Sequence, residues 1–306
     1  MPGHLTPAMS RVLTALATYH YLMPRQLPRL GLAPSVGAAQ KLLRRFNHET
    51  RLKPVPGRGH LYAPNPKSLI AAIRAGVDRD SGRISRMYYL TRLGAEQVAE
   101  LWQTDPAAIF YPKGDKQPLL DVLHRALTID CWIELTRFAE AGGGEVEFFH
   151  PYFRTTGTNR STEPRTPLRK LTRIDFPAEL VQKHKKPFFW PDAVFVLKTP
   201  KKRILCLLEV YRGIDTARVI SQLEWHLLAL EHGLPSLQYG FTTANKVLIV
   251  FETETALHAV LKRLLTRPGF EAFAPLVACS TLERLRQDFQ DWWYVRGGEI
   301  RGGGLV

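Results

Sequence analysis

The chain has 306 residues, and its 42 Lys and Arg side chains outnumber the 28 Asp and Glu, which gives a formal net charge of +14. Hydrophobic residues make up 45% and charged residues 23%. This balance excludes an intrinsically disordered chain, and the length suits one large domain or two ordinary ones. The three cysteines, Cys131, Cys206 and Cys279, lie far apart in apolar runs, which argues against a disulfide framework and a cysteine-rich zinc site.

The sequence offers no sign of membrane insertion or secretion. Its longest apolar stretches, such as VLIVF at 247–251, are far shorter than the ~20 residues that a membrane-spanning helix needs. The N-terminal segment MPGHLTPAMS lacks the basic-then-apolar pattern of a secretion signal. We therefore expect a cytoplasmic protein.

The positive charge is concentrated in the first part of the chain. Residues 1–118 contain 17 basic and 7 acidic side chains, whereas residues 119–214 carry a net charge of +5 and residues 215–306 carry −1. A basic field attracts polyanions, because neutralised phosphates release condensed counterions. Nucleic acid, and double-stranded DNA in particular, is the first candidate partner. The alternative is a protein that Lys and Arg merely keep in solution.

Residues 1–103 have the pattern of a winged helix-turn-helix domain. Apolar side chains recur at helical spacing in three segments. A glycine-flanked turn between two short extended runs is typical of the wing. The expected elements are helices at 6–19, 24–31 and 34–47, a hairpin at 51–64 with Arg58 at its tip, and a segment at 87–101 that begins as a strand and becomes a helix after Thr91.

In such a domain the third helix enters the major groove and the wing touches the DNA backbone. Six polar side chains on the third helix and the wing are candidates for these contacts. Lys41, Arg44, Arg45 and Arg58 are predicted to meet phosphates, and Ser35 or Gln40 to reach base edges. A helical bundle with a solvated polar face, or a winged helix that binds protein, remains the alternative.

Residues 104–118 contain three prolines and a glycine and indicate a linker to a second domain at 119–306. Alternating helices and strands there predict a mixed sheet flanked by helices, so the chain is expected to be an α/β (α+β) protein. Residues 154–187 are expected to be an exposed basic loop, and the final RGGEIRGGGLV a flexible tail. The expected helices are 119–141, 215–234 and 253–267, and the expected strands are 145–153, 188–197, 203–213 and 246–253.

Two carboxylates lie on neighbouring predicted strands of this domain. Asp192 opens one strand and Glu209 lies on the next, a spacing that brings both to one end of the sheet if the strands form a hairpin. Hard oxygen ligands suit Mg²⁺ or Mn²⁺, and Glu134 or Asp130 of the preceding helix could supply a third acid. The alternative roles are a turn cap for Asp192 and a simple ion pair for Glu209.

The sequence P-D-x16-E-x-Y resembles the P-D…(D/E)-x-K signature of the restriction-endonuclease-like phosphodiesterases. Together with the front domain, His124, PDAVFVL and LEVYRGID make the chain similar to the replication-relaxation family of plasmid and integrative-element mobilisation proteins over about residues 8–265. The resemblance implies DNA processing at a mobile element, with some related members acting as relaxases that nick an origin of transfer. It also implies that Asp192 and Glu209 hold the metal, and other mobilisation proteins are possible partners.

One position departs from the signature. Tyr211 stands where the catalytic Lys is expected, and a tyrosine, with a pKa near 10, cannot supply a cation to offset charge on the phosphate. Tyr211 could itself act as a nucleophile, and Gln222 on the following helix could orient a phosphate or a water. Three functions stay open: a metal-dependent nickase, a non-catalytic DNA-binding accessory protein or regulator, and an interaction module without DNA binding.

Overall fold

The computed structural model describes residues 5–46, 49–51, 62–64, 68–77, 84–112, 122–156 and 169–305. The chain divides into two compact units, Met1–Ile133 and Glu134–Val306. The division falls inside helix α4 (Val122–Ala141), whereas the sequence analysis placed it in a linker at 104–118. Within the described ranges, none of the helices combines the length and the apolar character that crossing a membrane requires.

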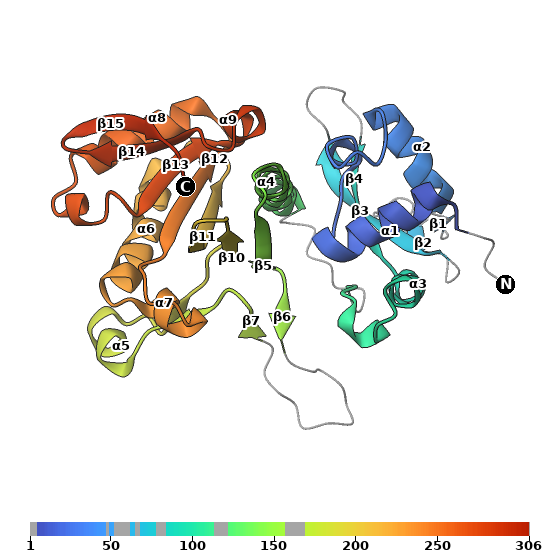
Figure 1. Ribbon diagram of the computed structural model, residues 1–306, viewed down its shortest axis with the longest axis horizontal. Helices are drawn as coiled ribbons and strands as arrows, with labels where there is room; N and C mark the ends of the chain where they lie inside the picture. The colour runs from blue at the N-terminus through green and yellow to red at the C-terminus, as the bar shows by residue number, and fades with distance from the viewer. Residues whose placement is uncertain are drawn as a thin grey trace, which may run out of the picture. The chain divides into compact units, whose positions relative to one another are not determined.

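Within the described residues, the first unit combines three complete α-helices and the start of α4 with two antiparallel ladders of two strands each (Figure 1). Its core is made of aliphatic side chains from all three helices and the second ladder, among them Leu13, Leu43, Ile70 and Val98. Its elements are α1 (Pro7–Tyr19), η1 (Pro24–Gln26), α2 (Val36–Phe46), β1 (Glu49–Arg51), β2 (Tyr62–Pro64), β3 (Ile70–Val77), β4 (Ile84–Leu90), α3 (Arg92–Trp102) and η2 (Pro106–Ala108).

The expected short helix at 24–31 is wrong in extent. Only Pro24–Gln26 forms a turn of 3-10 helix, and the chain then continues through turns that end at Gly31, whose φ of +65° is left-handed. Pro28 lacks the N–H donor that a regular helix would need at that position.

Helix α2 confirms the third predicted helix. Ala39 and Leu43, which lie four residues apart on one face, are buried. Val36, in the first turn of the helix, is 42% exposed.

The predicted wing lies partly within the described residues. Strands β1 and β2 pair antiparallel, with Glu49 opposite Pro64, as the two sides of a hairpin at 51–64 require. The tip, including Arg58, lies outside the described residues. The segment at 87–101 is confirmed, because β4 ends at Leu90 and the Thr91 hydroxyl accepts a hydrogen bond from the Gly94 N–H at the start of α3.

The first part of the expected linker packs onto the first unit. Ile109 is buried, and the Phe110 ring lies 4.4 Å from the His20 ring and 6.0 Å from the Tyr21 ring, measured between centroids. Ile109 and Phe110 therefore pack onto the first unit, whereas residues 104–108 are exposed.

The second unit is built on a seven-stranded mixed sheet with the order β15-β14-β13-β12-β11-β10-β5 (Figure 1). Strand β11 is parallel to β12 and β12 to β13, whereas the other neighbours are antiparallel. The elements of the sheet and its flanks are β5 (Glu145–Pro151), β10 (Ala193–Lys198), β11 (Arg203–Tyr211), α6 (Thr216–Glu231), α7 (Leu234–Tyr239), β12 (Lys246–Phe251), α8 (Glu254–Leu265), η4 (Phe270–Ala272), β13 (Val277–Thr281), α9 (Leu282–Gln287), β14 (Trp292–Arg296) and β15 (Glu299–Gly303).

Helices α6 and α8 cover one face of this sheet. Leu223 and Leu227 of α6 share a buried cluster with Leu257 and Val260 of α8 and with alternate residues of β12 and β13. Towards β10, Val194, Val196, Leu205 and Leu207 pack against the α6 residues Ala229, Trp225 and Leu228. Because side chains alternate along a strand, Asp192 and Glu209 share the face that carries Val194 and Leu207.

The prediction of an unstructured basic loop at 154–187 is wrong for its described part. Strands β6 (Thr155–Thr156) and β7 (Arg169–Lys170), strands β8 (Ile174–Asp175) and β9 (Phe188–Phe189), and helix α5 (Ala178–His184) are formed there. Ile174, Phe176 and Leu180 are buried, so a small apolar set holds the segment despite its many bases.

The prediction of a flexible C-terminal tail is also wrong. Strand β15 pairs with β14 from Trp292↔Gly303 to Arg296↔Glu299, and Leu305 is buried. Trp292 and Tyr294 of β14 are buried. Pairing with an aromatic neighbour strand stabilises a glycine-rich segment whose own strand propensity is low.

Candidate functional site

The hairpin of β10 and β11 sets the two predicted carboxylates opposite each other. Its register pairs Ala193 with Leu208, and continuing it by one residue places Asp192 across from Glu209. The Asp192 Oδ2 accepts a hydrogen bond of 2.8 Å from the Val210 N–H, and the Asp192 carbonyl accepts one of 2.8 Å from the Tyr152 N–H. The predicted convergence of the two side chains at one end of the sheet is therefore confirmed.

Glu209 lies in an environment that disfavours its charge. The residue is 8% exposed, and burial, the neighbouring Asp192 carboxylate and a hydrogen bond with that carboxylate raise its pKa well above 4.5. Burial and the adjacent carboxylate therefore favour the protonated form of Glu209. A bound cation would release that proton.

Helix α6 presents a polar stripe to the carboxyl pair. Arg218, Gln222 and His226 lie four residues apart and hence on one face of the helix. His226 is buried, and its Nε2 lies 2.7 Å from the Glu209 Oε1. Burial lowers the pKa of His226 to about 3, so the ring is neutral, and its Nε2 forms a hydrogen bond with the Glu209 carboxyl group.

Two cations act on Glu209 in place of the expected lysine. The charges of Arg218 and Lys186 both lower the pKa of Glu209 against the larger effect of burial. Lys186 is half-buried, with its Nζ 4.0 Å from the centroid of the Trp225 ring. Positive charge therefore reaches the site from α6 and from the segment before β9, neither of which the signature names.

Tyr211 is placed as a packing residue. Its side chain is buried, and its ring stacks on that of Phe251 with centroids 5.9 Å apart. Burial and the charges of Glu209 and Asp192 raise its pKa well above 10. A phenol held in its protonated form makes a poor nucleophile, so this geometry disfavours the hypothesis of a covalent tyrosine intermediate.

Among the described residues, no third acid joins Asp192 and Glu209 in a group that could hold a metal ion. Glu134 forms an ion pair of 3.0 Å with Arg137 on its own helix, and Asp130 forms one of 2.7 Å with Arg25 in the first unit. His124 likewise lies on the part of α4 that belongs to the first unit. Within the described residues, no group of three or more His, Cys, Asp or Glu side chains could hold a metal ion. That Glu134 or Asp130 completes the site stays a prediction.

The oxygen atoms around Asp192 and Glu209 nevertheless suit an ion such as Mg²⁺. Such an ion uses one or two carboxylates and fills its remaining positions with water and substrate oxygens. Besides Asp192 and Glu209, the stripe on α6 offers the Gln222 Oε1, which is buried and makes no hydrogen bond. A buried amide oxygen without a partner costs free energy, and a cation or a water would satisfy it.

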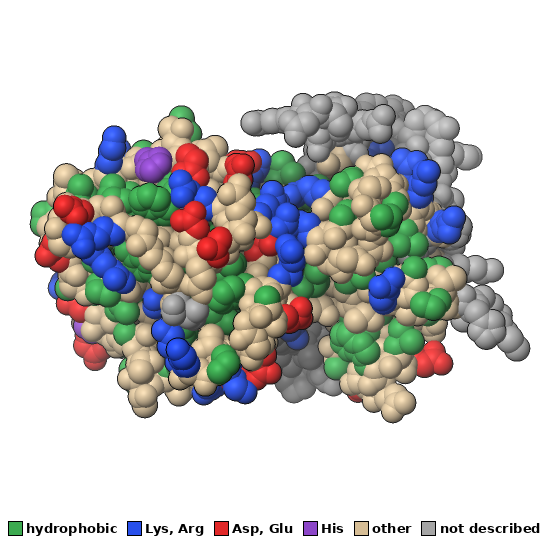
Figure 2. Space-filling model, turned by 45° about the horizontal axis from the view of Figure 1, so that its top comes forward, with side chains coloured by type: hydrophobic (Ala, Val, Ile, Leu, Met, Phe, Trp, Pro, Cys, Tyr) green, Lys and Arg blue, Asp and Glu red, His purple; other side chains and the backbone are tan. Residues whose placement is uncertain are grey.

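The predicted DNA-contacting residues of α2 lie at its surface. Lys41, Arg44 and Arg45 are exposed and Gln40 is half-buried, while the Ser35 hydroxyl accepts a hydrogen bond of 3.2 Å from the Ala38 N–H and so caps the helix. Figure 2 shows basic side chains over both units on the face that it presents, with acidic side chains gathered mainly over the second unit. The helix therefore offers positive charge to solvent, as the sequence predicts.

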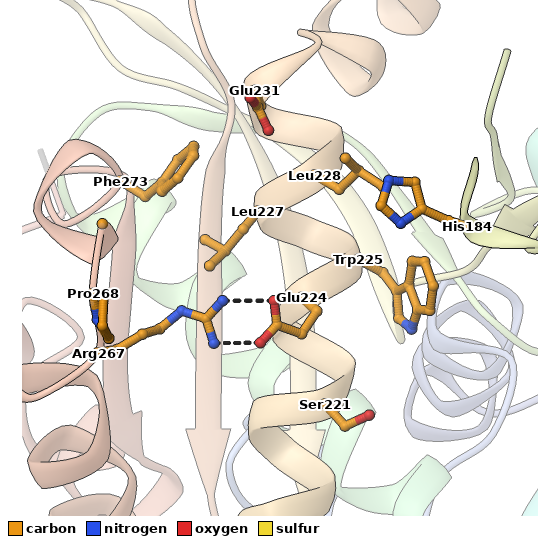
Figure 3. A pocket seen from close by; sticks show the side chains of 11 residues that line it. His184, Ser221, Glu224, Trp225, Leu227, Leu228, Glu231, Arg267, Pro268 and Phe273 are labelled. Carbon is orange, nitrogen blue, oxygen red and sulfur yellow. Dashed lines mark hydrogen bonds and ion pairs between the residues drawn. The ribbon is translucent and has the colours of Figure 1, made fainter. Parts of the chain in front are cut away.

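A separate hollow of about 480 Å³ lies on the other side of α6 (Figure 3). It is bordered by His184 and Trp225 on one side and by Pro268 and Phe273 on the other, and Arg267 forms a two-pronged ion pair with Glu224 across it. The carboxyl pair does not line this hollow, because Glu224 and Gln222 point to opposite faces of the helix. Within it, the charges of Arg267 and Glu224 neutralise each other.

The sequence analysis missed three residues of the site, namely His226, Arg218 and Lys186. His226 carried a signal, since it is a polar side chain within the apolar face that Leu223, Leu227 and Leu230 define. Arg218 precedes Gln222 by one turn, so the choice of Gln222 pointed to the same face. Lys186 had no such signal, because its position depends on how the segment before β9 folds back.

Comparison with known proteins identifies no relative. No protein-family model, no curated protein and no solved structure matches the chain.

Proposed function

We propose that this chain is a cytoplasmic DNA-binding protein whose second unit nicks DNA with the help of Mg²⁺ or Mn²⁺. The observation that carries the proposal is the placement of Asp192 opposite Glu209, with the unpartnered Gln222 amide oxygen on the facing helix. The resemblance of PDAVFVL and LEVYRGID to the replication-relaxation family motivates an origin of transfer or a promoter on a plasmid or integrative element as the target.

In this proposal the first unit acts as a winged helix-turn-helix domain on double-stranded DNA. The exposed Lys41, Arg44 and Arg45 face phosphates from α2, the helix that would enter the major groove. Because Ser35 already caps this helix, Gln40 is the better candidate for a contact to a base edge.

The proposed site holds its metal through Asp192, Glu209 and Gln222. The bound ion would polarise the phosphodiester and lower the pKa of a water. His226 orients Glu209 through the hydrogen bond of its Nε2, and Arg218 and Lys186 supply the positive charge that Tyr211 cannot offer to the phosphate.

Nicking of supercoiled plasmid in the presence of Mn²⁺ tests the proposal. Wild-type protein should convert supercoiled to open-circular DNA, and Asp192→Asn and Glu209→Gln should each slow this at least about 100-fold, as expected when an electrostatic element of a catalytic site is removed. Glu231→Gln, which removes an exposed acid from the far face of α6, should nick at the wild-type rate. Equal rates for wild type and Asp192→Asn contradict the proposal.

The binding part is tested by the salt dependence of affinity for a DNA duplex. Replacing Lys41, Arg44 and Arg45 together by Gln should weaken binding and flatten the slope of log K against log salt by about 3, since each phosphate contact contributes about one. A control variant in which the exposed Lys201, Lys202 and Lys262 are replaced by Gln removes the same charge from the second unit. If both triple variants behave alike, only net charge matters and the assignment of α2 is wrong.

A second candidate function is a non-catalytic, sequence-specific DNA-binding accessory protein or regulator. The buried Tyr211 in the position of the catalytic lysine favours it. Its signature is specific duplex binding through α2 without cleavage in any divalent metal.

A further inference from the structure

Aromatic rings and cations are interleaved beside the start of β10. This aromatic–cation surface consists of Tyr152, Lys170, Arg173, Phe188 and Trp190. The rings of Phe188 and Trp190 stack with centroids 4.9 Å apart and an interplanar angle of 26°. The Lys170 Nζ lies 4.3 Å from the centroid of the Trp190 ring and 5.4 Å from that of Tyr152, and the Arg173 guanidinium carbon lies 3.8 Å from that of Phe188.

The local fold holds these side chains together from three segments of the chain. The ladder of β8 and β9 pairs Asp175 with Phe188, which brings Arg173 beside the Phe188 ring. Strand β7 delivers Lys170, and the Leu171 carbonyl accepts a hydrogen bond of 3.0 Å from the Tyr239 hydroxyl. The surface is therefore built by ordered elements on the second unit.

Trp190 is the exposed member of this surface. It is 44% exposed, although its neighbours Phe189 and Pro191 are buried. Tryptophan usually buries most of its large apolar area, so an exposed ring that is stacked on a second aromatic and flanked by a lysine lacks an explanation in packing alone. Aromatic rings with adjacent cations are the elements that bind unpaired nucleobases, because the ring stacks on the base while the cation meets the phosphate.

We propose that the aromatic–cation surface binds single-stranded DNA, with an unpaired base stacked on Trp190 and with Lys170 meeting a flanking phosphate. Single-stranded DNA is favoured over a duplex because paired bases already stack on each other and leave no face free for a protein ring. The proposal rests on the proposed function only for the choice of DNA over RNA, since base stacking itself requires no metal.

The surface is adjacent to the carboxyl pair. Trp190 precedes Asp192 by two residues, and the Tyr152 N–H donates a hydrogen bond to the Asp192 carbonyl. A DNA strand whose base stacks on Trp190 would therefore lie next to Asp192 and Glu209. The surface would hold an unpaired segment next to the place where the proposed nicking occurs.

Fluorescence anisotropy of a labelled oligo(dT) of about 16 nucleotides, titrated with the full chain, tests this inference. Trp190→Ala should weaken binding about tenfold, within the range that one base–aromatic stack contributes. Trp190→Phe, which keeps a ring, should retain most of the affinity. Trp102→Ala is the matched control, because Trp102 is also 44% exposed but ends α3 in the first unit, and it should bind as wild type does.

Two further measurements define the ligand. Unlabelled duplex of the same length should displace oligo(dT) poorly from a variant whose Lys41, Arg44 and Arg45 are replaced by Gln, and Lys170→Gln should reduce the salt slope by about one. Wild-type affinity in Trp190→Ala, or equal displacement by duplex, overturns the proposal. Tighter binding of oligo(rU) than of oligo(dT) overturns the assignment to DNA.

The outcome is separable from that of the proposed function. Asp192→Asn should bind oligo(dT) normally while it fails to nick, because the carbonyl that holds Tyr152 belongs to the backbone. If Trp190→Ala binds oligo(dT) as wild type does and Asp192→Asn abolishes nicking, the stacking surface is refuted and the nuclease proposal stands. The reverse pattern refutes the nuclease proposal alone.

Discussion

Two groups of acidic side chains in the second unit have opposite electrostatic surroundings. Glu254 and Asp291 both form ion pairs with Arg284, at 2.7 Å and 3.0 Å, and the hydrogen bond from Arg284 lowers the pKa of Glu254. Asp192 and Glu209 instead face each other, and burial raises the pKa of Glu209. Acids paired with arginine stabilise the fold, whereas a buried pair of acids stores unfavourable energy that a cation relieves. This contrast is the reason why we propose the second group, and not the first, as the site of function.

The largest effect on stability is expected at His226, which contacts the pair of Asp192 and Glu209. His226→Leu removes the hydrogen bond between His226 and the Glu209 Oε1, and a buried polar group left without its partner costs about 2 kcal/mol of the free energy of unfolding. His258→Leu is the matched control, because His258 lies 3.6 Å from Glu254 in the other group but is half-exposed, and it should cost about 0.5 kcal/mol or less. Urea unfolding measures both; equal losses would contradict the contrast.

The two groups should also give opposite dependences on pH. The raised pKa of Glu209 means that the folded state holds a proton which the unfolded state has lost, so its contribution to stability falls as the pH rises from 4.5 through the raised value. The lowered pKa of Glu254 gives stability that is present above pH 4.5 and is lost as the pH falls through the lowered value.

Unfolding of Glu209→Gln and Glu254→Gln across pH 3 to 8 checks these signs. Relative to wild type, Glu209→Gln should gain stability as the pH rises above 4.5. Glu254→Gln should lose stability relative to wild type as the pH rises towards 4.5. The same direction of change in both variants would show that the two groups do not differ.

A smaller effect is expected at Arg284, which forms ion pairs with Glu254 and Asp291. Arg284→Ala breaks the pairs with Glu254 and Asp291 and removes the guanidinium that lies 5.1 Å from the centroid of the Trp293 ring. A partly exposed network of this kind contributes about 1 kcal/mol, and added salt should reduce the difference from wild type. Chemical unfolding at low and high salt measures it.

The smallest effect is expected from an isolated surface pair. Lys198 and Glu145 lie 2.6 Å apart across two strands, but both side chains are half-exposed. Lys198→Gln should leave the denaturant midpoint unchanged, because water screens such a pair almost completely. A loss as large as that of Arg284→Ala would mean that proximity alone, and not the surrounding network, sets the contribution of an ion pair.

The sequence predicted those parts of the fold that depend on local patterns. Helix α1 and the hairpin of β10 and β11 follow from strong apolar periodicity, and the spacing of Asp192 and Glu209 across that hairpin placed both at one end of the sheet. The carboxyl pair could be found from the sequence because a hairpin converts spacing into proximity.

Other parts could not be predicted, because they depend on contacts between distant segments. A small number of apolar residues, such as Ile174 and Phe176, hold in place a segment whose composition is basic and polar. Strand β15 has a glycine-rich sequence and is formed by pairing with β14. The partner of Glu209 is His226, which reaches the site only when α6 packs on the sheet.

Binding of Mn²⁺ to the full chain, measured by titration calorimetry, tests the central claim most directly. The account predicts one site whose occupation releases about one proton, since Glu209 must ionise to bind. Asp192→Asn and Glu209→Gln should abolish this binding, and Glu254→Gln should leave it intact. Absence of binding by the wild type, or its loss in Glu254→Gln as well, would contradict the assignment of Asp192 and Glu209 as the metal ligands.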